Sequence, residues 1–62
     1  MFVFNLEEIF KEISRAIKLK KTFVEVGVLH SNKYLLTELK DVGYNYQAQE
    51  ITTIAVYIKI YV

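Results

Sequence analysis

Few residues in this 62-residue chain have side chains suited to acid–base or nucleophilic chemistry. His30 is the single histidine, the residue type most often used as a general base, and Ser31 follows it directly. Cysteine is absent, which excludes a thiol nucleophile, a disulfide framework and a thiolate metal site. A serine just before an amphipathic segment is more often a helix cap than a nucleophile. We therefore predict no catalytic site and no enzymatic activity.

Acidic side chains are the next candidates, because carboxylates can hold a cation. Glu7, Glu8 and Glu12 are close together in the sequence. Acids at the start of a helix are commonly solvated and favoured by the helix dipole, which is the more economical interpretation. There is neither a glycine-rich phosphate loop nor a metal-ligand spacing. The sequence thus predicts no metal, cofactor or small-molecule substrate.

A basic segment is the stronger lead, although the net charge is only +1. Arg15, Lys18, Lys20 and Lys21 fall within seven positions at the end of a predicted helix. Such a cluster can neutralise backbone phosphates without reading base sequence. Cations at a helix C-terminus are also ordinary, and composition leaves both interpretations open. Lys33, near the start of a second predicted helix, is a further candidate for contact with a phosphate.

The C-terminal segment combines charge with aromatic rings. Tyr57, Lys59 and Tyr61 alternate and would share one face of a strand. This pattern suits base stacking with an adjacent cation, and it is equally compatible with protection of an edge strand.

Periodicity predicts the elements that position these residues. A helix is expected over 5–19, with Asn5 as its cap, Glu8 completing a capping box and Glu7–Lys11 as an ion pair. Its apolar face comprises Leu6, Ile9, Phe10, Ile13, Ala16 and Ile17. Strands are expected over 23–28, 44–49 and 53–62. A second helix, capped by Ser31 or Asn32, buries Leu35, Leu36, Leu39 and Val42 and stops at Gly43.

The predicted architecture is one α+β domain over 1–62, with the order α-β-α-β-β. Two helices cover one face of a small three-stranded sheet, Gly27 marks a bend leaving the first strand, and residues 50–52 form the last turn. Phe23, Tyr57 and Tyr61 lie on the opposite face, which nothing in the chain is expected to cover. We interpret these three residues as a partner surface. The apolar run 54–62 is too short for a membrane span and contains Lys59.

Three motifs, in order and at matching spacing, resemble the N-terminal domain of small-subunit ribosomal protein eight. They are Val24-Glu25-Val26, the helix end Leu39-Lys40-Asp41-Val42-Gly43-Tyr44, and Val56-Tyr57-Ile58-Lys59. Ala16 fits the basic helix end of that family, Ser14-Arg15 replaces its Arg-Asn pair, and Gly27 stands where the family usually has proline.

The resemblance implies a structural constituent of the ribosome that contacts ribosomal RNA and neighbouring small-subunit proteins during translation. The family's C-terminal domain has no counterpart in these residues, which suggests the ribonucleoprotein of an organelle and therefore a mitochondrial location. The alternative hypothesis is a viral or plasmid-type interaction module that dimerises through its sheet without RNA.

Overall fold

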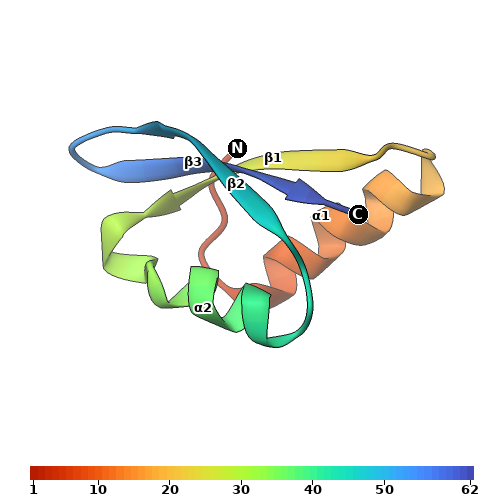
Figure 1. The fold of residues 1–62 in the computed structure, drawn as a ribbon, viewed down its shortest axis with the longest axis horizontal. Helices are drawn as coiled ribbons and strands as arrows, with labels where there is room; N and C mark the ends of the chain where they lie inside the picture. The colour runs from red at the N-terminus through yellow and green to blue at the C-terminus, as the bar shows by residue number, and fades with distance from the viewer.

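The alternating apolar residues of the C-terminal segment form the middle strand of a sheet in the computed structural model, which describes residues 1–62 (Figure 1). The elements are α1 (Leu6–Lys18), β1 (Phe23–Leu29), the 3₁₀ turn η1 (His30–Asn32), α2 (Tyr34–Asp41), β2 (Tyr46–Ile51) and β3 (Ala55–Tyr61). The sheet order is β1-β3-β2, and both pairings are antiparallel. Both helices lie on one face, so the predicted α-β-α-β-β architecture is confirmed.

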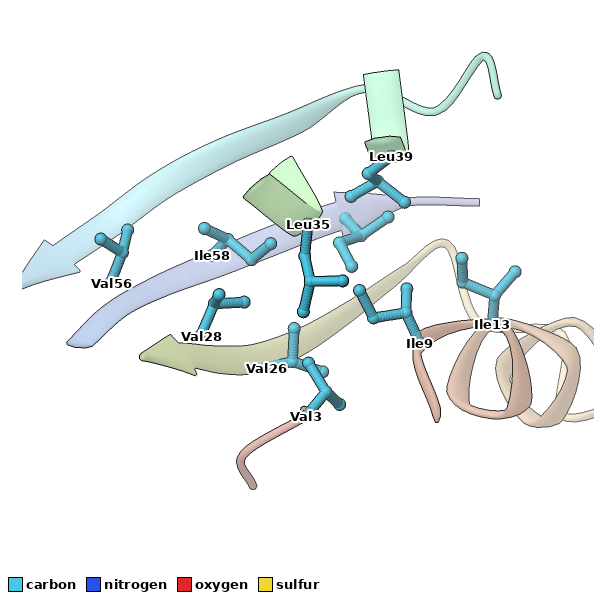
Figure 2. Packing of buried hydrophobic residues seen from close by; sticks show 10 residues of the cluster. Val3, Ile9, Ile13, Val26, Val28, Leu35, Leu39, Val56 and Ile58 are labelled. Carbon is cyan, nitrogen blue, oxygen red and sulfur yellow. The ribbon is translucent and has the colours of Figure 1, made fainter. Parts of the chain in front are cut away.

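The core lies between the helices and this face of the sheet (Figure 2). Val26 and Val28 of β1 face the same way as Val56, Ile58 and Ile60 of β3, because Val26 lies opposite Ile58 and Val28 lies opposite Val56 across the two strands. The helices and the N-terminal segment supply the remaining large buried side chains, namely Val3, Ile9, Ile13, Leu35 and Leu39. A second set of side chains therefore points to the face that no helix covers.

The start of α1 follows from Asn5. Its side-chain oxygen accepts a hydrogen bond from the Glu8 amide (2.9 Å), as an N-cap should. The Glu8 carboxylate accepts from the Phe4 amide (3.2 Å) instead of from Asn5, so the predicted capping box is present only in a displaced form. The predicted Glu7–Lys11 ion pair is not formed, and the ion pair on α1 joins Arg15 to Glu12 (3.6 Å).

The second helix ends as predicted but begins differently. Gly43 has φ +98°, its amide donates to the Lys40 carbonyl (2.9 Å), and the Tyr44 amide donates to the Leu39 carbonyl (3.1 Å). These two bonds form a Schellman motif. The prediction of a Ser31 or Asn32 cap was wrong. Those residues form η1, and Lys33 occupies the N-cap position without a side-chain hydrogen bond.

Several residues assigned to the core are exposed. Ile17 is 57% exposed and Val42 is 51% exposed, while Phe10 lies at the margin of the core and meets Tyr44 (ring centroids 6.4 Å apart). Tyr44 lies three residues after the last residue of α2, so the contact marks where that helix ends against α1. Ile17 lies about 10 Å farther along α1, beyond this contact. The eight-residue α2 is too short to cover it.

The β2–β3 hairpin is displaced by two residues from its predicted position, because a threonine forms its turn. The Thr52 hydroxyl accepts from the amides of Ile54 (3.3 Å) and Ala55 (3.0 Å). The Thr52 amide donates to the Ala55 carbonyl (2.8 Å). The turn thus replaces the missing Gly, Pro, Asn and Asp with a side chain that bonds its own loop. Alternation along the predicted strand 53–62 would place Ile54 on the core face, but this residue lies in the loop and is 64% exposed.

Gly27 lies within β1 and does not mark a bend. It pairs with Tyr57 on one side. On the other side its carbonyl accepts from the Val3 amide (3.0 Å) and its amide donates to the Met1 carbonyl (2.7 Å). The Phe2 ring lies over this position and meets Tyr57 (centroids 5.7 Å apart). The prediction that nothing in the chain covers the outer face was therefore wrong at Tyr57.

Substitution of Gly27 by Ala should displace Phe2, since the added Cβ would lie 2.9 Å from two Phe2 ring carbons and 3.0 Å from Tyr57 Cε1. We expect the free energy of unfolding to fall by about 1–2 kcal/mol, as for a crowded core. In a Phe2→Ala background the same change should cost clearly less. Urea unfolding of all four proteins measures both values, and equal costs in the two backgrounds would contradict a clash with Phe2.

Thr52→Ala should destabilise the hairpin turn, because two amides lose their acceptor. The expected loss is about 1–2 kcal/mol, on the scale of one or two hydrogen bonds. For a domain of this size, each kcal/mol corresponds to a fall of roughly 4–8 °C in Tm. Thr52→Ser is the matched control, since it keeps the hydroxyl and should retain most of the stability in thermal unfolding followed by circular dichroism. An equal loss in both variants would assign the effect to the methyl group.

Candidate nucleic-acid interface

The basic residues at the end of α1 border an open groove between that helix and the start of β1. The groove has a volume of about 650 Å³. Ala16, Leu19 and Val24 supply apolar lining, and three cations, Arg15, Lys20 and Lys21, lie around it. Because the two lysines and Leu19 are exposed, the groove is open to a large ligand such as a nucleic-acid strand.

The chain reverses direction at Lys20, and this reversal creates the groove. Its amide donates to the Ile17 carbonyl (3.0 Å), and the Lys21 amide donates to the Ala16 carbonyl (2.9 Å). This is a second Schellman motif, but here a lysine occupies the left-handed position, with φ 58°. Glycine usually takes this position because a Cβ makes the conformation costly, by roughly 1–2 kcal/mol. Strain of this kind at an exposed cation is an observation that favours a functional role.

The electrostatics of the groove are not uniformly positive. Glu12 and Glu25 also line it. Glu12 is engaged by Arg15 at 3.6 Å, in the one ion pair of the chain within 4.0 Å. Lys20 and Lys21 therefore have no carboxylate within this distance and remain available to an external anion.

Lys18, the fourth cation of the predicted cluster, and Lys33, the separate candidate for a phosphate contact, do not line the groove. Lys18 instead borders a shallow surface of α1 together with Glu7, Lys11 and Arg15. Lys33 follows β1 and η1, whereas Lys20 precedes β1. The seven-residue β1 spans about 20 Å, with α1 near one end and α2 near the other (Figure 1). Lys20 and Lys33 therefore lie at opposite ends of the strand. The structure thus joins Arg15, Lys20 and Lys21 but does not bring Lys33 to them.

A second group lies on the outer face of the sheet, beside the groove. Phe23 and Tyr61 are directly opposed across β1 and β3. Lys59 Nζ lies over both rings, 4.1 Å from the Phe23 centroid and 5.8 Å from that of Tyr61. Phe23 also lines the groove, and the Val62 amide donates to the Thr22 carbonyl (3.0 Å), so the two groups adjoin. We call Phe23, Lys59 and Tyr61 the aromatic platform.

The predicted outer-face set therefore divides into two parts. Phe23 and Tyr61 are 37% and 43% exposed, whereas Tyr57 is half-buried beneath Phe2. Lys59 belongs to the central strand of the sheet, so its interpretation as edge-strand protection was wrong. The sequence did not predict a role for Gln47. Its side-chain oxygen accepts a hydrogen bond from the Tyr61 hydroxyl (3.1 Å) and orients that ring, and only the strand register reveals the contact.

His30 has a structural position. Its Nε2 lies 2.8 Å from the Thr52 carbonyl, and its amide donates to the Ile54 carbonyl (3.0 Å). Both contacts attach the end of β1 to the β2–β3 turn. Ser31 is exposed and does not cap α2. No three His, Asp or Glu side chains lie together in an arrangement that could hold a metal ion.

Comparison with models of known protein families, with curated proteins and with solved structures yields no match. No helix has the length and apolar character needed to cross a membrane. Function is therefore inferred from the chain's own residues.

Lys20→Gly should raise the free energy of unfolding by roughly 1 kcal/mol, because glycine relieves the left-handed strain. Lys21→Gly is the matched control. Lys20 is the one non-glycine residue with positive φ, so glycine at position 21 relieves nothing. Chemical denaturation of the two variants measures the difference. If Lys20→Gly were neutral or destabilising, the side chain of Lys20 would have to stabilise the turn by some other contact.

Proposed function

We propose that this chain is a structural, RNA-binding component of a ribonucleoprotein, specifically of the small subunit of a mitochondrial ribosome. In this role it contacts the backbone of ribosomal RNA and neighbouring ribosomal proteins and catalyses no reaction. The supporting observation is the pair of unneutralised lysines, Lys20 and Lys21, at the mouth of a groove that adjoins exposed aromatic rings. Phosphate contacts of this kind position a protein on RNA without selecting a sequence.

The size of the chain is consistent with a bound role. A domain of about 60 residues buries only about 60% of the surface of its unfolded chain and is marginally stable alone. Only 13 residues of this chain are buried, and no disulfide supports them. A partner that binds the folded state alone adds stability by mass action.

One feature favours the competing hypothesis of an interaction module. The strand β2 pairs only with β3, and five of its six residues are exposed, including Ile51 (70%). An open edge of this kind can accept a strand from another chain. However, a bulge between Ala48 and Glu50 and the charge of Glu50 interrupt the edge, and both are features that discourage such pairing. We therefore favour the RNA-bound role.

Replacement of both lysines, in Lys20→Gln/Lys21→Gln, should weaken binding to RNA and reduce its salt dependence. Loss of two phosphate contacts should lower the slope of log K against log salt by about 1.4 for a single strand or 1.8 for a duplex. Fluorescence anisotropy titrations between 50 and 200 mM salt (about a fourfold range) measure this slope. Lys11→Gln/Lys33→Gln is the matched control, because it removes the same charge from other surfaces.

An equal change in the two double variants would contradict a local phosphate site and indicate only an effect of net charge.

Sedimentation of the native protein with and without nuclease separates the two functional hypotheses. Release from a large particle by nuclease supports the RNA-bound role, whereas small dimers in both samples support the interaction module.

A further inference from the structure

The aromatic platform presents ring faces that no element of the chain covers. Both helices lie on the other face of the sheet (Figure 1), and the Phe2 ring packs on Tyr57 and Gly27. Phe23 and Tyr61 are exposed and occupy directly opposed positions on neighbouring strands. Opposed residues of an antiparallel pair are about 5 Å apart, which suits adjacent ring faces for flat ligands.

The Lys59 ammonium group lies over the Phe23 and Tyr61 rings, so a base that stacks on these rings must displace it. A cation over an exposed ring is worth about two- to fivefold in an equilibrium constant. Stacking of a nucleic-acid base on an aromatic side chain is worth about five- to 150-fold. The base therefore displaces the ammonium group, and the flexible lysine side chain can then reach a phosphate of the same strand.

The orientation of Tyr61 is fixed before any ligand binds. Its hydroxyl donates to Gln47 Oε1 at 3.1 Å, and its backbone amide donates to the Asn45 carbonyl at 3.0 Å. A ring held in this way loses little conformational entropy when a base stacks on it. Glu25, opposite Lys59 in the strand register, opposes close approach of phosphates at the middle of this face. Phosphates are therefore favoured toward Lys20 and Lys21, at the end of the sheet.

From this arrangement, and resting on the proposed function, we infer that the site binds an unpaired segment of RNA, not a continuous duplex. In a duplex the base faces are stacked on one another and unavailable, so only phosphate contacts to Lys20 and Lys21 remain. In a single strand the phosphates follow the groove while one or two bases stack on Phe23 and Tyr61. The platform thus selects strand state and not base sequence.

Three ten-nucleotide RNA probes test this inference with the intact protein: an unstructured single strand, the same strand without its bases, and a blunt duplex. We expect the intact strand to bind about tenfold more tightly than the abasic strand, which lies within the range that stacking of one base predicts after displacement of Lys59. Tyr61→Leu and Phe23→Leu should abolish this difference while leaving the salt slope unchanged. Tyr34→Leu is the matched control, since Tyr34 is an exposed tyrosine at the start of α2.

The outcomes separate this inference from the proposed function. Equal affinity of the wild-type protein for the intact and abasic strands would overturn base stacking, while the phosphate-binding role would stand. Tighter binding of the duplex would also overturn it. Absence of binding to all three probes at 50 mM salt (about the lower limit at which phosphate contacts are usually compared) would overturn both. Since the abasic comparison uses the wild-type protein, it is decisive even if a leucine variant fails to fold.

Discussion

The antiparallel pairing of β3 with both other strands is the interaction on which this structure depends. The strands β1 and β2 do not pair with each other, and each forms its ladder with β3. Three of the large core side chains, Val56, Ile58 and Ile60, come from β3 and lie beneath the helices. The sheet therefore cannot form until the last strand inserts between the earlier two. Its assembly requires contacts between segments that are distant in sequence, which raises the entropic cost of folding.

The elements of the fold follow from local patterns, whereas their boundaries depend on contacts with other segments. The helical period of α1 and the alternation in β1 and β3 are strong enough to predict all three elements. The predicted position of the last turn was wrong because the Thr52 hydroxyl accepts a hydrogen bond from a backbone amide of the turn, a role that Asn or Asp usually has. This role is visible only in the folded loop. Ile17 satisfies the helical period of α1, but it lies beyond the end of α2. Its side chain is exposed because α2 is too short to cover it. The role of Gly27 could not be predicted without the N-terminal segment, in which Phe2, 25 residues earlier in the sequence, forms a bridge to it.

The candidate site shows the same division between local and distant information. Lys20 and Lys21 were identified from their position after a helix, and the structure places them at a groove with Arg15. The sequence could not separate Lys18 and Lys33 from this group, because proximity in sequence does not fix direction around a helix or distance along a strand. It also could not pair Phe23 with Tyr61, which meet only through the register of β1 and β3. Of the three aromatic rings predicted on the outer face, Phe23 and Tyr61 are exposed, whereas Phe2 packs on Tyr57.

The groove and the platform meet where the start of β1 joins the end of β3, at the hydrogen bond from Val62 to Thr22. Both ends would fray in a small domain, and the left-handed Lys20 adds strain of roughly 1–2 kcal/mol beside them. A ligand present at 100 times its Kd stabilises the folded state by about 2.7 kcal/mol. The free energy of binding where the groove and the aromatic platform meet would therefore exceed the strain at Lys20. The bound ligand would also hold the two strand ends together. A lysine in the place of glycine is then understandable as a residue that costs stability in the free chain and contributes charge in the bound one.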